Sequence, residues 1–181
     1  MKTTWLVLTV TFVTGLCGCS RGGLNVVGGD ATLAANEDSA VLLDRLASGK
    51  TVGENDAARG MVLLLDGKDS CRTFQDRITL LRGRGVVGEH WDFVADRAIT
   101  RGRLAYMVYQ ACKMRGGLTL ALAGPSERYC LRELAYRRMM TVGPELTPAT
   151  GMEFVAVLSR ADAYIRTGQS PEVLAAKGVQ Q

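Results

Sequence analysis

The chain has few of the residues on which catalysis and metal binding usually depend. Its 181 residues include one histidine, 4 prolines and 6% aromatic side chains. A single histidine excludes catalytic or metal sites built from several imidazoles. The 22 Lys and Arg nearly balance the 18 Asp and Glu, and a net charge of +4 is too small to indicate nucleic acid. We therefore predict no cofactor, no metal site and no nucleic-acid partner.

Other absences bound the fold class. The 21 glycines follow no G-X-Y period, which excludes collagen. A hydrophobic fraction of 47% with balanced charge excludes a disordered chain. The sequence has one apolar stretch near its start that could engage a membrane, so it is not a polytopic membrane protein. The length predicts one domain or one compact array.

That apolar stretch has the pattern of a signal sequence. Lys2 precedes an apolar run from Trp5 to Leu16, which is too short for a comfortable membrane span. The run ends in Leu16-Cys17-Gly18-Cys19, which resembles the bacterial lipobox. The resemblance implies that the Cys19 thiol receives diacylglycerol, that cleavage follows Gly18, and that the new amino group is acylated, commonly with palmitate. An ordinary signal peptide or an N-terminal membrane anchor is the alternative.

These features divide the chain into three parts. Residues 1–18 are the expected signal peptide, and residues 19–36 are the lipidated cysteine followed by a flexible tether rich in glycine and small residues. Residues 37–181 are the expected folded domain. We expect a membrane-anchored lipoprotein facing the periplasm or the cell exterior. Ser20 after the cysteine, in place of Asp, favours the outer membrane of a diderm bacterium.

The domain shows apolar spacing near 3.6 residues, which is typical of helices. Asn55, Thr100 and Ser126 are candidate N-caps. The segment 118–122 is the one short strand candidate, and an extended loop or a helical turn would fit it equally well. Helices are predicted over 38–48, 55–66, 73–84, 100–112, 125–138, 150–166 and 170–177.

Parts of the domain repeat. Residues 78–87 align with 131–140 at an offset of 53, and residues 100–111 align with 150–161 at an offset of 50. A fainter copy covers 41–65. We predict an all-α fold of three helix–loop–helix repeats of about 50 residues packed as one bundle, because each hairpin alone has too little apolar surface to fold. Chance similarity between amphipathic helices is the alternative.

The strip Ile99-Thr100-Arg101-Gly102-Arg103-Leu104-Ala105 is similar to the helix start of the S-layer homology module. The second copy keeps the Thr and Glu of that strip, at Thr150 and Glu153, and lacks the Arg. The resemblance implies three units packed around a pseudo-threefold axis that bind anionic cell-wall polysaccharide through Arg101. Alternatively, Arg101 is a solvated first-turn residue or a partner of Asp96. The connection 124–129 resembles that of small planctomycete-type envelope lipoproteins.

Other side chains are weaker candidates for glycan binding. Trp91 could stack on a sugar ring, or it could plug the end of a helical hairpin. Arg137 and Arg138, with Arg128 and Arg132, could contact anionic glycans or lipid head groups, or could form the solvated face of a helix. The sequence places no nucleophile, base and orienting group together, so we expect no enzymatic activity.

Three cysteines remain after the expected cleavage. Cys112 and Cys130 flank a glycine-rich connection and are candidates for a disulfide, because the compartment beyond the inner membrane can be oxidising. The alternative is that these two and Cys71 are small buried hydrophobic residues.

The sequence thus favours a non-enzymatic, lipid-anchored envelope protein whose helical repeats act as an interaction or scaffold module. Its partners would be the membrane, reached through the lipid, and a wall polymer or an envelope protein. A wall-polysaccharide-binding module of the S-layer homology type is the alternative, and an envelope glycan hydrolase is a minor one.

The lipobox makes a direct prediction. Cys19→Ala removes the thiol that would carry the lipid, so the protein should leave the membrane fraction of the producing cells. Fractionation followed by immunoblotting measures this, with Cys17→Ala as the control that keeps the acceptor thiol. An unchanged distribution of the Cys19→Ala protein would show that the lipid anchor is wrong.

Overall fold

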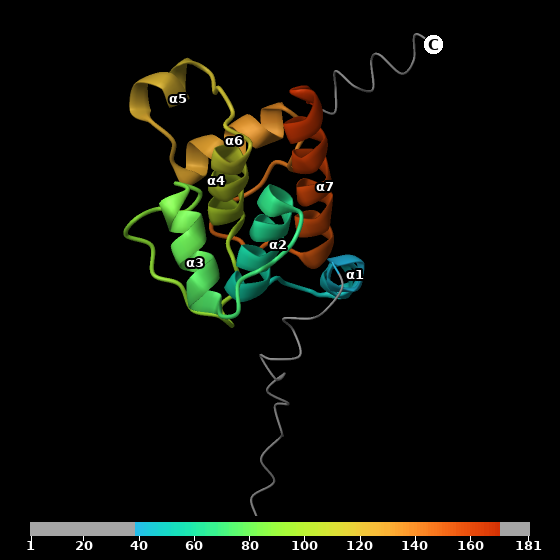
Figure 1. The fold of residues 1–181 in the computed structure, drawn as a ribbon. Helices are drawn as coiled ribbons and strands as arrows, with labels where there is room; N and C mark the ends of the chain where they lie inside the picture. The colour runs from blue at the N-terminus through green and yellow to red at the C-terminus, as the bar shows by residue number, and fades with distance from the viewer. Residues whose placement is uncertain (1–38, 171–181) are drawn as a thin grey trace, which may run out of the picture.

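The computed structural model describes residues 39–170, which contain seven helices and no strand (Figure 1). The all-α prediction is confirmed for this part of the chain. The signal peptide and tether expected over 1–36 lie outside the described residues, as does the helix expected over 170–177 apart from Ser170. The helices are α1 (Ser39–Ser48), α2 (Glu54–Asp66), α3 (Phe74–Gly83), α4 (Arg101–Ala111), α5 (Leu118–Ala123), α6 (Glu127–Tyr136) and α7 (Gly151–Thr167).

Side-chain caps fix several helix starts. Thr100, Ser126 and Thr150 each accept a hydrogen bond from the backbone N–H three residues later, as the sequence predicted for the first two. Helix α2 differs, because Gly53 is its N-cap and Asn55 lies inside the first turn. The ambiguous segment 118–122 is helical and belongs to α5. No helix between residues 39 and 170 combines the length and hydropathy that spanning a membrane requires.

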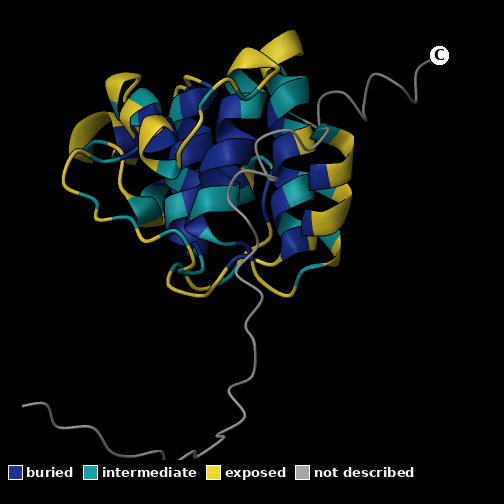
Figure 2. Ribbon diagram, turned by 60° about the horizontal axis from the view of Figure 1, so that its bottom comes forward, coloured by how far each residue is buried: buried dark blue, intermediate teal, exposed yellow. Residues whose placement is uncertain are grey.

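The body is built on three central helices, α2, α4 and α7, which contact one another. Each carries one outer helix: α3 packs on α2, α6 on α4, and α1 on α7. Figure 2 shows the buried residues gathered inside the body and the exposed residues on its outer faces and loops. The expected packed hairpins are therefore wrong, since helices joined by a long loop, such as α3 and α4, do not pack mainly on each other. Each central helix instead packs on the outer helix that follows it, and α7 closes the body on α1.

A ring of backbone hydrogen bonds joins the three loops that enter the central helices. The N–H of Ile99 donates to the carbonyl of Val52 at 2.9 Å, that of Ala149 to Ile99 at 2.9 Å, and that of Val52 to Ala149 at 3.2 Å. All three residues are fully buried, and each stands two residues before the first residue of its helix. The three helix starts are thereby fixed around one point.

The loops also satisfy helix N–H groups that have no partner inside the helix. The N–H of Glu54, first in α2, donates to the carbonyl of Arg97 at 2.8 Å. The N–H of Arg101, first in α4, donates to the carbonyl of Thr147 at 2.9 Å. Each helix start therefore holds the loop that leads to the next central helix.

Side chains of unequal size fill the core between the central helices. Phe154 of α7 is fully buried, and its ring lies where a Cβ on Gly60 of α2 would come within 2.6 Å. Leu104 and Ala57 are also fully buried. They are the fourth residues of α4 and α2, as Phe154 is of α7. The large ring on one helix is thus accommodated by small residues on its neighbour.

Gly151 lies where the start of α7 closely approaches the backbone of α1. A Cβ there would lie 1.7 Å from the Leu46 carbonyl oxygen, so Gly151→Ala must separate α7 from α1 and strain the hydrogen bond that Gly151 donates to Gly49. We expect a loss of about 3 kcal/mol in the free energy of unfolding, measured by urea denaturation of residues 37–181. Gly83→Ala is the matched control, because nothing lies within 4 Å of its added Cβ. Equal stability of the two variants would contradict the close approach of α1 and α7.

Candidate functional site

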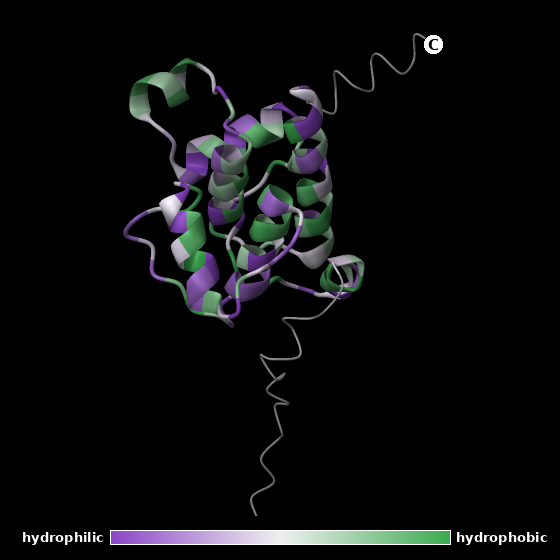
Figure 3. Cartoon of the chain, viewed as in Figure 1, coloured by the Kyte–Doolittle hydropathy of each residue, from purple (hydrophilic) through white to green (hydrophobic). Residues whose placement is uncertain are grey.

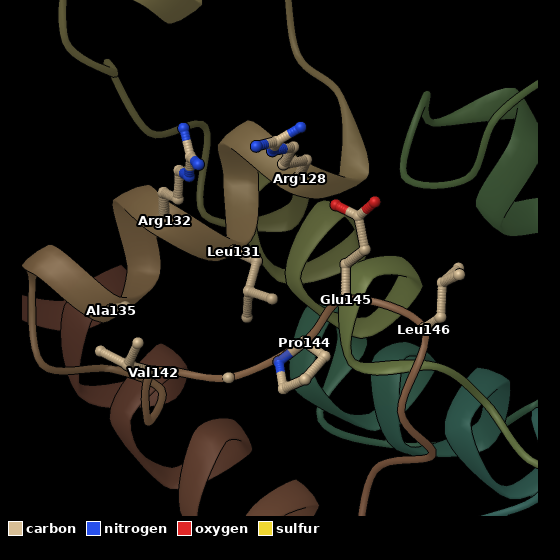
Figure 4. Close-up of a pocket in the computed structure, with 9 residues that line it drawn as sticks. Arg128, Leu131, Arg132, Ala135, Val142, Pro144, Glu145 and Leu146 are labelled. Carbon is tan, nitrogen blue, oxygen red and sulfur yellow. The ribbon is translucent and has the colours of Figure 1, made fainter.

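A groove lies between α6 and the segment 142–146, which leads toward α7 (Figure 4). Its volume is about 400 Å³. Leu131 of α6 is buried at its base, while Val142 and Leu146 on the opposite wall are 89% and 75% exposed. Two arginines of α6 and one glutamate border this apolar surface. The lining residues are Arg128, Leu131, Arg132, Ala135, Val142, Gly143, Pro144, Glu145 and Leu146.

Arg101 lies behind the wall of this groove. Its side chain is buried, with Nε 3.0 Å from Glu153 Oε1 and Nη2 2.8 Å from the same oxygen. Nη2 also donates to the carbonyl and the hydroxyl of Thr141. A Cβ on Gly143 would come within 1.8 Å of Nη1, so the guanidinium occupies the space that a side chain at 143 would need. Arg101 therefore positions the groove wall and does not line the groove.

The loop before α4 is also held by a buried charged side chain, which here is a carboxylate. Glu54, in the first position of α2, is buried and accepts hydrogen bonds from Arg97 at 2.8 Å and from Arg103 at 2.8 Å. Its other oxygen accepts the Val94 N–H at 2.7 Å. A buried carboxylate needs such partners to offset its desolvation. The Glu54 carboxylate thus holds the loop before α4, as the Arg101 guanidinium holds the loop before α7.

The two loops differ in the residue that stands at one corresponding position. Phe93 and Gly143 occupy corresponding positions: Phe93 lies six residues before Ile99, and Gly143 lies six residues before Ala149, in the ring of backbone hydrogen bonds. Phe93 packs with Phe74 and Trp91 at centroid distances of 6.5 and 6.0 Å. At Gly143 the Arg101 guanidinium fills the space that a side chain would need, and the groove lies beside this loop and α6.

Trp91 lies within this aromatic cluster. Its ring is 5.1 Å from that of Tyr106, and the Arg103 guanidinium lies 5.0 Å above it. The indole also covers Gly88, where an added Cβ would come within 2.8 Å of Nε1. The neighbouring His90 is exposed. Trp91 therefore packs within the body, against Phe93, Tyr106 and Arg103.

Arg137 and Arg138 lie away from Arg101 and Trp91. Arg137 donates to Glu133 at 2.7 Å and to the Arg115 carbonyl at 2.6 Å, and it lies 5.9 Å from the Tyr164 ring centroid. Arg138 is exposed, with a φ of 57°. The structure therefore does not bring the four glycan-binding candidates into one site. The basic residues that line a groove are Arg128 and Arg132, which the sequence indicated only as part of a basic cluster.

The three cysteines among the described residues are free thiols, and the disulfide considered between Cys112 and Cys130 is not formed. Both of these residues are buried, and burial raises the pKa of each thiol to about 12. Cys71 is partly exposed, and desolvation followed by the charge of Asp69 raises the pKa of its thiol. Buried thiols of this kind behave as small hydrophobic side chains.

Carboxylates gather near one end of the groove. Burial raises the pKa of Glu127; Arg103 opposes this shift and the neighbouring Glu145 adds to it. Between residues 39 and 170 no group of His, Cys, Asp and Glu side chains is arranged to hold a metal ion. The groove therefore offers apolar surface, guanidinium donors and carboxylate acceptors, which is chemistry suited to binding.

No protein-family model matches the chain, and neither the curated proteins nor the solved structures include a significant match to it.

The buried pair of Arg101 and Glu153 can be tested by its effect on stability. Arg101→Ala leaves a largely buried carboxylate without its partner, so it should lower the free energy of unfolding by about 3 kcal/mol. Urea denaturation of residues 37–181 measures this, and adding Glu153→Ala should restore part of the loss. Arg84→Ala, which breaks the more exposed pair with Asp66, should cost less than about 1 kcal/mol. Similar losses in both single variants would contradict a positioning role for Arg101.

Proposed function

We propose that the chain is a non-enzymatic, lipid-anchored protein of the bacterial cell envelope, and that its helical body acts as an interaction module through the groove beside α6. The anchor rests on the sequence Leu16-Cys17-Gly18-Cys19 and on the short apolar run before it. Two or three acyl chains on Cys19 would hold the protein stably at a membrane, which one chain cannot do. The tether would then present the helical body beyond the membrane surface.

We further propose that the body consists of three diverged repeats around a pseudo-threefold axis, similar to the S-layer homology module. Two cyclic relations and one pairwise contact support this proposal. Val52, Ile99 and Ala149 bond in a closed ring, and each central helix packs on the next outer helix around the body. In addition, Arg101 at the first position of α4 pairs with Glu153 at the third position of α7, which joins two copies of the similar strip.

The groove beside α6 is the observation that carries the binding proposal. Apolar side chains at Leu131, Val142 and Leu146 suit the flat faces of sugar rings or an apolar peptide side chain. Arg128 and Arg132 are exposed at its edge and can donate in pairs to a carboxylate or a phosphate. These two arginines favour an anionic wall polysaccharide as the second candidate function, with a protein partner in the envelope as the general one.

The wall-polymer version is tested with purified cell wall. Residues 37–181 should be retained by it, and the double substitution Arg128→Ser with Arg132→Ser should weaken retention by about tenfold or more, because two charge-assisted hydrogen bonds are lost. The control is Lys68→Ser with Arg72→Ser, which removes the same charge from exposed positions between α2 and α3.

The outcomes separate the versions of this proposal. Equal loss in both double variants would show that retention reflects net charge and that the groove is not the site. Absence of retention for the unsubstituted protein would show that wall polymer is not the ligand. Arg101→Ala is unsuitable as a binding probe, because that side chain is buried and its removal would alter the loop itself.

A further inference from the structure

Helix α5 is an apolar segment that stands outside the body of the protein. Its sequence from Leu118 to Ala123 is LTLALA, and among the helices it packs on α6 (Figure 3). Leu120 holds it in place: this side chain is buried and folds over Gly116, where an added Cβ would lie 2.3 Å from its Cδ1. The other two leucines, Leu118 and Leu122, are 76% and 80% exposed.

Aromatic residues continue this surface onto α6. Tyr136 is 82% exposed, and Tyr129 is partly exposed. With Thr119 and Arg132 they border a second hollow, of about 250 Å³, between α5 and α6. Tyrosine is common where a protein meets both an apolar phase and water, because its ring is apolar and its hydroxyl is polar.

The charge around α5 is strongly positive. Residues 113–138 contain six basic side chains and two acidic ones, Glu127 and Glu133. Glu133 is paired with Arg137 at 2.7 Å, and Glu127 lies 4.0 Å from Arg103 of α4. Glu133 is thus closely paired within the body, and Glu127 faces a cation of α4. Exposed basic residues precede α5 at 113 and 115 and follow it at 128 and 132.

We propose that α5 is a membrane-contact element, which inserts Leu118 and Leu122 into the interface of an anionic lipid bilayer while the surrounding lysine and arginines contact lipid phosphates. Exposed apolar side chains bordered by basic residues are the pattern of interfacial membrane binding. The positive surface is complementary to an anionic bilayer. An apolar contact with a protein would bury the leucines equally well but would not account for the exposed basic residues on both sides of α5.

The position of α5 is compatible with contact to the membrane that holds the proposed anchor. In Figure 1, α5 lies at the opposite end of the body from α1, where the described chain begins. The twenty residues from Cys19 to Asp38 can span at most about 70 Å, whereas a body of this size has a radius of gyration of about 14 Å. The tether is therefore long enough for α5 to reach the same membrane. This step alone rests on the proposed anchor.

The test uses residues 20–181, which omit the signal peptide and the lipid-bearing cysteine, so any binding must come from the body. The fragment retains every core residue and both helices, α1 and α7, that close the body on itself. Co-sedimentation is measured with vesicles of phosphatidylcholine and with vesicles of phosphatidylcholine mixed with phosphatidylglycerol. We expect binding to the mixed vesicles and much weaker binding to phosphatidylcholine alone.

Two leucine substitutions test the apolar part. Leu118→Ser with Leu122→Ser should weaken binding to the mixed vesicles by about tenfold or more, because both side chains lose their apolar contact with lipid. Val94→Ser with Met152→Ser is the matched control. Both side chains are well exposed, Val94 in the loop before α4 and Met152 in α7. The control should bind as the unsubstituted fragment does.

Two charge substitutions test the basic part without altering the groove beside α6. Lys113→Gln with Arg115→Gln should weaken binding by about fivefold for each charge, and added salt should remove the difference. Lys50→Gln with Lys68→Gln removes equal charge from exposed positions elsewhere and should have little effect.

Three results would overturn the proposal. The first is absence of binding to the mixed vesicles. The second is binding that the two leucine substitutions leave unchanged. The third is a concentration-dependent dimer in solution that disappears with those substitutions, which would assign the leucines to a protein contact. Because Cys19 is absent from the fragment, none of these results depends on whether the lipid anchor is correct.

Discussion

The ring of hydrogen bonds among Val52, Ile99 and Ala149 is the constraint on which the rest of this structure depends. A buried backbone group without a partner costs more than one hydrogen bond contributes, so the three loops must meet if any one of them is to be buried. Their meeting places the starts of α2, α4 and α7 together, and the N–H groups of those starts then bond to neighbouring loop carbonyls. Segments almost a hundred residues apart in sequence are joined in this way. The outer helices complete the arrangement by covering the apolar sides of the central ones.

The groove beside α6 is a consequence of the same arrangement. The loop before α7 is held from behind by the Arg101 side chain, and that side chain fills the space that any side chain at position 143 would require. Position 143 must therefore be glycine, because any larger residue would displace the guanidinium that holds the loop beside the groove. At the corresponding place before α4, Glu54 holds the loop and Phe93 is accommodated with Trp91. A buried ionic side chain thus holds each loop, with an aromatic cluster beside one loop and the groove beside the other.

Much of the fold could be predicted from the sequence, since Thr100 and Ser126 indicate helix starts and the apolar spacing predicts the helices that follow. The partners of the helices could not, because apolar periodicity shows that a face is buried but not which helix covers it. Helices close in sequence were expected to form hairpins, whereas each central helix packs on the outer helix that follows it, and α7 packs on α1. The site was harder still. The strip from Ile99 to Ala105 made Arg101 a candidate for glycan binding. The structure shows that Glu153 and Thr141 accept the hydrogen bonds of its guanidinium.

The two buried ion pairs at the helix starts have opposite polarity, with the carboxylate on the earlier helix in one and on the later helix in the other. This asymmetry distinguishes the starts of the three central helices from one another. If α2, α4 and α7 were arranged in the reverse cyclic order, Glu54 would face Glu153, and two carboxylates would be brought together with little access to water. Two like charges in such a place repel strongly and also lose their hydration. The polarity of these pairs therefore favours the cyclic order in which α2, α4 and α7 are arranged.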